Sequence, residues 1–154
     1  MDDIDLAILR ALQENGRVSI SDIGSKINLS VSAVGERIKK LEKSGVINHY
    51  TAIINGKYFN KELTALMFIS LESPKFIDSF LKFVNEENDI LECHYIAGNY
   101  DYMIKIVTNN PETLEKILNK VKGVTGIIKT YTNVVLKTTK NNYSIYPSVL
   151  PLGK

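Results

Sequence analysis

Two stretches of the chain combine side-chain types whose spacing is suited to binding charged ligands. In residues 17–43 six cations stand against three acids, a net charge of +3, whereas residues 1–16 have a net charge of −3. Clustered Lys and Arg side chains neutralise the phosphates of nucleic acids. The second stretch is residues 98–106 (GNYDYMIKI), in which a glycine turn precedes an acid between two tyrosines. Turn amides donate to a carboxylate and Asp101 accepts from an ammonium group, which suits a free amino acid. From the residues alone, a plain hairpin tip remains the preferred interpretation.

Helical patterns position the basic stretch. Apolar residues recur at helical spacing in three successive segments, residues 4–12, 20–27 and 31–41. Ser19 and Ser30 stand where helix N-caps are expected. Only Asn28-Leu29 lies between the second segment and the Ser30 cap of the third. Two helices joined by so short a turn form a helix-turn-helix, whose second helix enters the DNA major groove.

The outward side of the third helix is suited to DNA. Small and polar groups near its start suit base edges, and cations toward its end suit phosphates. Glu36 has two roles open to it: accepting from a cytosine N4, or pairing with Lys40 one turn on. A charge run alone would fit a solvated basic helix, but the tight turn, the caps and the cation distribution together favour double-stranded DNA as a partner. The predicted DNA-binding residues are Arg17, Ser30, Ser32, Ala33, Glu36, Arg37, Lys39 and Lys40.

From residue 62 onward the pattern changes to strands and helices in the order βαββαβ, a ferredoxin-like arrangement. Helices are expected after Pro74 and Pro111, and strands at residues 63–71, 90–97, 100–107 and 124–137. The first strand is apolar on both faces, although helices cover only one face of such a sheet. A second copy of the chain is the simplest cover for the other face. We therefore predict a homodimer with twofold symmetry.

Both halves of the sequence resemble the Lrp/AsnC family. The run IDLAILRALQENGRVSISDIGSKINLSVSAVGERIKKLEKSGVINHYTAII is similar to the family's N-terminal half through IDxxIL, LQxNGR, LSxSxV and RIKKLEKSGVI. ILECHYIAGNYDYMIKI and TYTNVVL resemble its effector-sensing domain. The resemblance covers roughly residues 2–138. It implies a sequence-specific transcriptional regulator in a bacterium or archaeon.

The resemblance also implies an assembly and a ligand. Dimers of the family stack into larger rings, often octamers, and a free amino acid binds near the Gly-x-Tyr-Asp-Tyr turn at dimer–dimer contacts. Thr130 and Thr132 share a face of the last strand and would supply hydroxyls, although strand propensity explains them equally well. The predicted effector-binding residues are Gly98, Asn99, Tyr100, Asp101, Thr130 and Thr132.

The predicted fold class is α+β, with an N-terminal winged helix-turn-helix domain and a C-terminal ferredoxin-like βαββαβ effector-sensing domain. Pro147 and Pro151 exclude a regular helix near the end of the chain. That tail is expected to be disordered or to dock on a neighbouring subunit. The predicted parts are a DNA-binding domain (1–50), a linker strand (51–61), an effector-binding and oligomerisation domain (62–138) and a C-terminal tail (139–154).

No catalytic site, metal site or cofactor is expected. Cys93 and His94 are neighbours on a predicted strand, so they point to opposite faces. Glu92 and His94 share a face, but a structural or interface histidine is the expected role. The sequence contains no phosphate-loop or dinucleotide motif. The chain is therefore not expected to be an enzyme.

The chain is expected in the cytoplasm and, as a DNA-binding protein, in association with the nucleoid. A single cysteine fits a reducing compartment, and the acidic N-terminus lacks the pattern of a signal peptide. No apolar run approaches membrane-spanning length, so no membrane partner is expected. Two rival functions remain open: an architectural protein that wraps DNA without an effector, and a small ferredoxin-like enzyme or metabolite-binding subunit.

Overall fold

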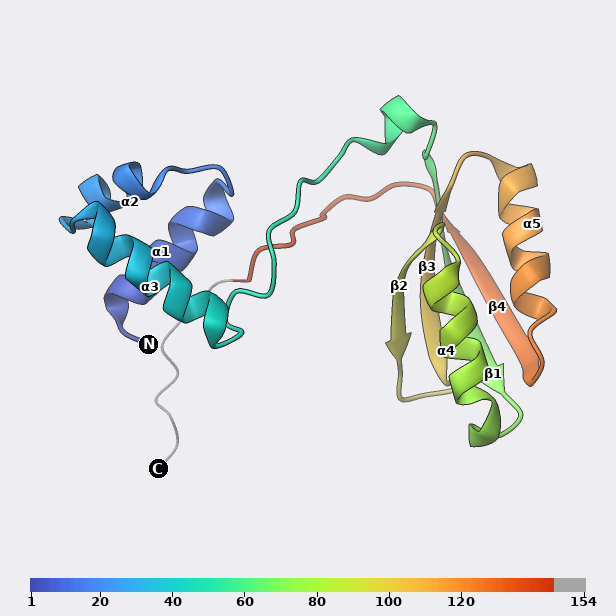
Figure 1. Cartoon of the computed structure of the whole chain (residues 1–154). Helices are drawn as coiled ribbons and strands as arrows, with labels where there is room; N and C mark the ends of the chain where they lie inside the picture. The colour runs from blue at the N-terminus through green and yellow to red at the C-terminus, as the bar shows by residue number, and fades with distance from the viewer. Residues whose placement is uncertain (146–154) are drawn as a thin grey trace. The chain divides into compact units, whose positions relative to one another are not determined.

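The computed structural model describes residues 1–145 and divides into two compact units (Figure 1). The N-terminal unit contains Met1–Ile53 together with residues 141–145 of the described chain, and the C-terminal unit contains Ile54–Lys140. Residues 139 and 140 of the predicted tail therefore belong to the C-terminal unit, and residues 141–145 belong to the N-terminal unit. The part of the tail after residue 145 lies outside the described residues.

Three helices form the N-terminal unit: α1 (Asp3–Glu14), α2 (Ile20–Ile27) and α3 (Val31–Lys43). Each begins after a side chain that accepts a hydrogen bond from the first turn, namely Asp2, Ser19 and Ser30. Their apolar faces meet in one core, made of Ile8, Leu9, Ile23, Val34, Ile38 and Leu41. The predicted helix-turn-helix is confirmed in α2 and α3.

The turn between α2 and α3 is unusually tight. Asn28 adopts the left-handed conformation, with φ of 55°, at the end of α2. A Cβ added at Gly24 would lie 2.6 Å from the carbonyl oxygen of Leu29, closer than real Cβ atoms come. Glycine at this position therefore lets the turn pack against α2.

Two expected features of the N-terminal half are not formed. Residues 1–53 and 141–145 contain no strand, so the helix-turn-helix has no wing hairpin in the described chain. Residues 48–55 have no regular structure where a linker strand was expected, and Gly56–Phe59 forms a short 3-10 helix. A strand is stabilised by hydrogen bonds to a neighbouring strand, and the described residues of a single chain offer none here.

The C-terminal unit has the predicted βαββαβ order. Its strands form one antiparallel sheet in the order β2-β3-β1-β4, the arrangement of a ferredoxin-like fold. Pro111 stands in the first turn of α5, and Asn110 caps that helix. The predicted α+β class is confirmed. The elements are β1 (Leu63–Leu71), the 3-10 helix η2 (Pro74–Phe76), α4 (Ile77–Glu86), β2 (Ile90–Tyr95), β3 (Tyr102–Thr108), α5 (Pro111–Lys122) and β4 (Ile127–Val135).

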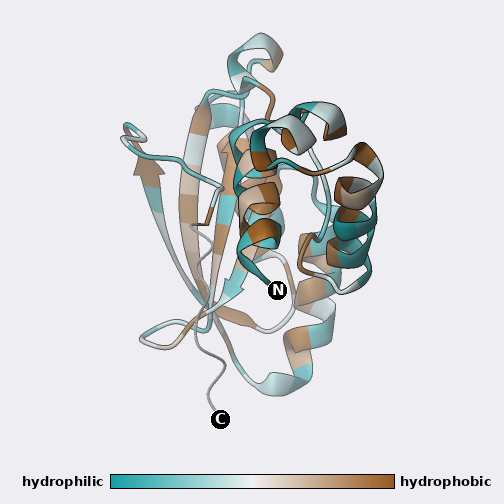
Figure 2. Ribbon diagram, turned by 90° about the vertical axis from the view of Figure 1, so that its left-hand side faces the viewer, coloured by the Kyte–Doolittle hydropathy of each residue, from teal (hydrophilic) through white to brown (hydrophobic). Residues whose placement is uncertain are grey.

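The two faces of the sheet differ in their cover. On one face, alternate residues of β1 (Ala65, Met67 and Ile69) are fully buried in a core with α4 and α5. Figure 2 shows apolar segments along the strands and the helices. On the other face Leu66 and Phe68 are only partly buried. We call this second face, which carries Leu66, Phe68, Met103 and Tyr131, the open face.

Candidate functional sites

The first turn of α3 presents the small polar side chains that the sequence assigns to base reading. Ser30 Oγ accepts from the backbone N–H of Ala33 at 3.2 Å and lies 3.1 Å from Ser32 Oγ. Both serines are exposed, and Ala33 is half-buried. Ser30 thus caps the helix, and the two hydroxyls form an exposed polar group at the end of α3 that enters the groove in this motif.

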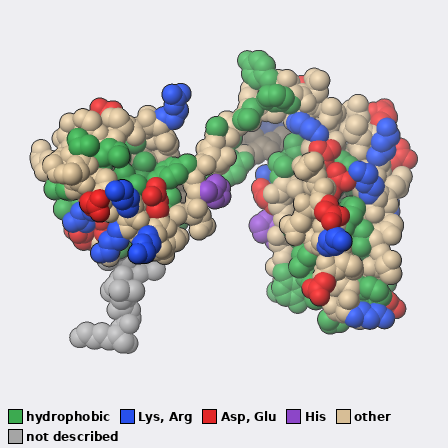
Figure 3. Space-filling model, viewed as in Figure 1, with side chains coloured by type: hydrophobic (Ala, Val, Ile, Leu, Met, Phe, Trp, Pro, Cys, Tyr) green, Lys and Arg blue, Asp and Glu red, His purple; other side chains and the backbone are tan. Residues whose placement is uncertain are grey.

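Cations are exposed along the same helix. Lys39 Nζ lies 3.1 Å from Glu36 Oε1, so Glu36 pairs with Lys39 rather than with Lys40. Both side chains of the pair are about three-quarters exposed, at 74% and 76%, and such a pair contributes little to stability. Lys39 can therefore exchange Glu36 for a phosphate. Figure 3 shows basic and acidic side chains gathered on one face of the N-terminal unit.

Arg37 differs from its neighbours on α3. Arg37 was predicted as a DNA contact; its side chain is 32% exposed and contacts the first turn of α1. Its Nη1 donates to both Asp2 oxygens at 2.9 and 2.8 Å and to Asp5 Oδ1 at 2.7 Å. Successive residues of a helix are rotated by about 100° around its axis, so Arg37 points about 100° away from its exposed neighbour Glu36.

Hydrogen bonds among Asp2, Asp5 and Arg37 shift two pKa values. The pKa of Asp2 is lowered, first by the backbone N–H that Asp5 donates at 2.9 Å and then by the hydrogen bond from Arg37. Hydrogen bonds to Asp5 and Asp2 raise the pKa of Arg37. Asp2 also donates its backbone N–H to Asp5 Oδ2 at 3.0 Å, which completes a capping box. The guanidinium thus joins the capped end of α1 to the middle of α3.

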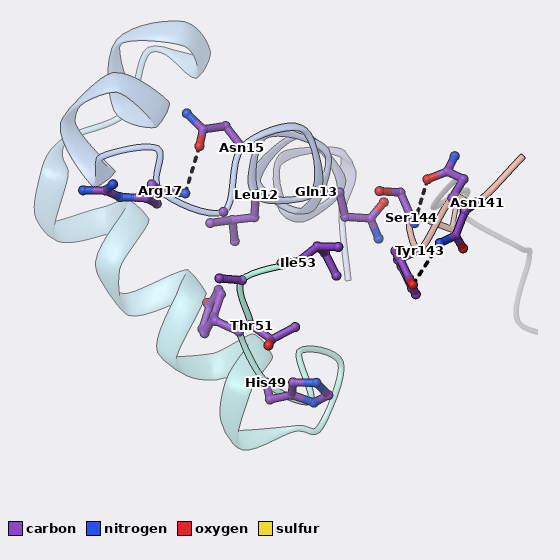
Figure 4. Close-up of a pocket in the computed structure, with 14 residues that line it drawn as sticks. Leu12, Gln13, Asn15, Arg17, His49, Thr51, Ile53, Asn141, Tyr143 and Ser144 are labelled. Carbon is purple, nitrogen blue, oxygen red and sulfur yellow. Dashed lines mark hydrogen bonds between the residues drawn. The ribbon is translucent and has the colours of Figure 1, made fainter. Parts of the chain in front are cut away.

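Arg17 stands apart from α3, in the turn that follows α1. Its backbone N–H donates to Asn15 Oδ1 at 3.0 Å, and it borders a hollow of about 880 Å³ (Figure 4). The hollow is lined by the end of α1, by residues 49–53 and by residues 141–144. In the returning chain, Asn141 Nδ2 donates to the Tyr143 hydroxyl at 3.0 Å. Residues 141–144 of the predicted tail therefore line a hollow of the N-terminal unit.

The turn before β3 is anchored by Asp101. Gly98 has φ of +148°, a conformation that favours glycine. Asp101 donates its backbone N–H to Ile69 O at 2.9 Å, and its Oδ2 accepts from the backbone N–H of Leu71 at 2.8 Å. One oxygen of the candidate ammonium acceptor is thus used to hold the turn at the end of β1. The sequence did not reveal this role, because Leu71 is 30 residues away.

Tyr100 belongs to a cluster on the open face. Its ring centroid lies 5.7 Å from that of Phe68 and 6.4 Å from that of Tyr131, and Lys129 Nζ lies 4.7 Å from the Tyr100 centroid. Sequence reasoning missed three of these residues, because only the pairing of β1 with β4 brings them together. We call Phe68, Tyr100, Lys129 and Tyr131 the aromatic–lysine cluster.

Thr130 and Thr132 are separated from that cluster. They are paired with Ile69 and Met67 of β1, whose side chains lie in the core beneath the helices. Directly opposed residues of antiparallel strands share a face, and successive residues point to opposite faces. Tyr131 therefore lies on the open face and the two threonines on the other. One chain alone does not bring the predicted effector-binding residues together.

A charged group also lies on the open face, beside β2. Lys105 Nζ donates to Glu92 Oε1 at 2.7 Å, and His94 Nε2 lies 3.4 Å from Glu92 Oε2. The hydrogen bond from Lys105 is the main cause that lowers the pKa of Glu92. Burial raises the pKa of the Cys93 thiol. The prediction that Glu92 and His94 share a face is confirmed.

Metal sites and membrane-spanning helices are absent from residues 1–145. They contain no group of three or more His, Cys, Asp or Glu side chains that is placed to hold a metal ion. No helix among them combines the length and apolar character needed to cross a bilayer. That the protein needs no cofactor stays a prediction.

Two family models match the chain. Residues 1–42 match the AsnC-type helix-turn-helix domain, and residues 64–145 match the Lrp/AsnC ligand binding domain. The second match alone spans more than half of the 154 residues. The chain belongs to the Lrp/AsnC family. It is a transcriptional regulator with a DNA-binding helix-turn-helix and a ligand-binding domain, and the family match reaches beyond residue 138, where the resemblance ended.

Named relatives of this Lrp/AsnC protein are regulators. The HTH-type transcriptional regulator FL11 of Pyrococcus abyssi is 35% identical over 140 residues, which cover 91% of this chain and 92% of that protein. The leucine-responsive regulatory protein of Klebsiella pneumoniae is 31% identical over 145 residues, covering 92% and 88% of the two chains. Neither name describes an enzyme.

Solved structures of the family share the fold. The Neisseria meningitidis transcriptional regulator NMB0573, in complex with L-Met, matches with a TM-score of 0.90 at 26% identity, covering 94% of this chain and 96% of that one. AsnC of E. coli matches with a TM-score of 0.88 at 24% identity, covering 96% and 99%, and this likeness concerns the fold alone.

Proposed function

We propose that this Lrp/AsnC regulator binds a free amino acid in its C-terminal unit and that the bound amino acid changes its affinity for operator DNA. The observation that carries the proposal is the likeness to the Neisseria regulator, whose solved structure is an L-Met complex. An effector acts in this way only if it binds the DNA-competent and DNA-incompetent states with different affinities.

Groups at the end of β1 support an amino-acid site. Lys129 is paired opposite Ser70, and Asp101 accepts from the backbone N–H of Leu71, so a cation and an acid approach the same end of the strand. A free amino acid needs a cation for its carboxylate and an acceptor for its ammonium group. Tyr100 supplies an apolar ring beside them. Thr130 and Thr132 lie on the other sheet face, so they would contribute only through another subunit.

The open face supports a homodimer. Leu66, Phe68 and Met103 are partly exposed apolar side chains on a sheet that helices cover on the other side only. A twofold pair of sheets would bury these side chains and would carry two helix-turn-helix units to two operator half-sites. Further stacking of dimers into rings, up to an octamer, is part of the proposal. Light scattering of the purified chain at rising concentration measures it.

On DNA, we assign base reading to the exposed start of α3 and phosphate contact to its cations. Ser32 and Ala33 stand at the end of the helix that enters the groove, while Lys39 and Lys40 are exposed farther along it. Glu36 is held by Lys39 until a phosphate replaces it. Arg17 would contribute from the turn after α1.

Titration of each standard amino acid against the complex of the full chain with its own promoter fragment tests the effector. We expect one or a few amino acids to change the DNA dissociation constant and to raise the unfolding temperature. A ligand at 100 times its dissociation constant stabilises by about 2.7 kcal/mol. If no amino acid changes either the DNA dissociation constant or the unfolding temperature, the effector hypothesis is rejected and a DNA-wrapping architectural protein is favoured. A chain that binds no DNA would favour a metabolite-binding subunit or enzyme.

A further inference from the structure

Arg37 is a cation of α3 that the proposed DNA contacts leave unexplained. Its neighbours Glu36 and Lys39 are 76% and 74% exposed, whereas Arg37 is 32% exposed. All three of its hydrogen bonds use Nη1, and they reach residues 32 and 35 positions away in sequence. A contact over such a separation ties two helices together, which an ion pair within one helix does not.

Local charge argues against a phosphate at Arg37. The guanidinium carries one positive charge, while Asp2 and Asp5 carry one negative charge each, so these three side chains together have a net charge of −1. Both carboxylates lie within hydrogen-bonding distance of the same nitrogen, at 2.8 and 2.7 Å. A phosphate would have to approach these carboxylates, and Asp5, at 15% exposure, is poorly screened by solvent. Lys39, by contrast, is paired with the exposed acid Glu36.

We propose that Arg37 is a positioning residue, which holds the first turn of α1 against α3 and so sets the angle at which Ser32 and Lys39 meet DNA. Asp2, which precedes α1, and Asp5, in its first turn, then act in DNA recognition without touching DNA. Apolar contacts beneath α3 are not directional, whereas a charged hydrogen bond has a defined geometry. The inference rests on α3 being the DNA-reading helix, as proposed above.

The test compares variants of the full chain on two duplexes, one of random sequence and one selected by the wild-type protein from a random pool. Arg37→Gln and Asp5→Asn each remove one side of the contact. Asp3→Asn is the matched control, because Asp3 lies in the same acidic first turn while the hydrogen bonds of Arg37 go to Asp2 and Asp5. Lys39→Gln is the control for a phosphate contact.

Arg37→Gln and Asp5→Asn should each lower the affinity ratio of selected to random duplex by at least about threefold relative to Asp3→Asn, and their effects should not add in the double variant. On the random duplex, the slope of log K against log salt should change by about 0.9 in Lys39→Gln, the loss of one phosphate contact. In Arg37→Gln it should stay within about 0.3 of the wild-type slope. Arg37→Lys, which keeps a charged donor, should recover part of the ratio.

If Arg37 instead contacts a DNA phosphate that Asp2 and Asp5 partly block, the opposite results are expected. Asp5→Asn would then bind random DNA more tightly than Asp3→Asn, and Arg37→Gln would lose about 0.9 of the slope. Either result overturns the proposal, as does an unchanged ratio in both Arg37→Gln and Asp5→Asn. If Lys39→Gln leaves the slope unchanged, the assignment of α3 to DNA fails and this proposal fails with it. If Arg37→Gln does not fold, Arg37→Lys and Asp5→Asn carry the test.

Discussion

In the N-terminal unit the candidate DNA contacts come mainly from one helix, α3, whereas in the C-terminal unit the aromatic–lysine cluster draws on β1, β4 and the turn before β3. Side chains of a helix are positioned by residues one or two turns away. The cluster exists only when β1 pairs with β4, which begins at Ile127. Substitutions of exposed side chains on α3 should therefore change binding with little effect on folding, while substitutions near the Gly98 turn should change both.

The largest effect is expected in the core of the C-terminal unit. Phe80 is fully buried, and its ring centroid lies 4.9 Å from that of Tyr102. Phe80→Ala should lower the free energy of unfolding of this unit by about 3–5 kcal/mol. Hydrogen exchange read by mass spectrometry should show lost protection in β1 to β4 and retained protection in α1 to α3. Equal loss of protection in both units would show that they unfold together and would contradict the difference proposed between them.

Asp101 separates structural from ligand-binding roles in the second unit. Asp101→Ala removes the acceptor of the Leu71 N–H and should cost about 1–3 kcal/mol of stability. Asp101→Asn keeps an acceptor oxygen but removes the charge, so it should retain most of the stability and lose the response to amino acids. Thermal unfolding with and without amino acid measures both effects. An Asp101→Asn variant with a full response would exclude the carboxylate as the ammonium acceptor.

Gly35 tests the first unit, where binding and folding should move independently. A Cβ added at Gly35 meets no described atom within 4 Å, so packing in the chain does not require glycine there. Gly35→Ala should raise the free energy of unfolding by about 1 kcal/mol through helix propensity. We expect weaker DNA binding in the same variant, because close approach of DNA is the remaining reason for glycine. Higher stability with unchanged DNA affinity would contradict that reason.

The smallest expected effect is a pH dependence in both units. Because the pKa of Asp2 is lower in the folded than in the unfolded chain, its contribution to stability is complete above the unfolded value of 3.8. It disappears as the pH falls below that value through the folded pKa. The pKa of Glu92 is lowered from 4.5, mainly by the hydrogen bond from Lys105. Its contribution to the stability of the C-terminal unit therefore depends on pH in the same direction. Unfolding temperatures of Asp2→Asn and Glu92→Gln should approach the wild-type value on acidification, and a widening gap would contradict this.

Local patterns predicted the three N-terminal helices, the Ser19 and Ser30 caps and the βαββαβ order, because periodicity and capping depend on residues close in sequence. The contact of Arg37 with Asp2 and Asp5 was not predicted, since these acids stand at the start of α1 and no local pattern links them to position 37. The strand expected in the linker failed for a related reason, because a strand needs a partner. Phe68 and Tyr131 could not be joined to Tyr100 without the register of β1 on β4. The same register places Thr130 and Thr132 on the sheet face opposite to the aromatic–lysine cluster.

The central place of β1 has a consequence for synthesis of the chain. β1 pairs with β3 on one side and β4 on the other, and these strands end at Thr108 and Val135. α1 to α3 are complete by Lys43, and such local folds form quickly. A nascent chain therefore acquires its helical unit while β1, apolar on both faces, still has two unpaired backbone edges. During that interval, strand pairing with another nascent chain competes with the folding of the sheet.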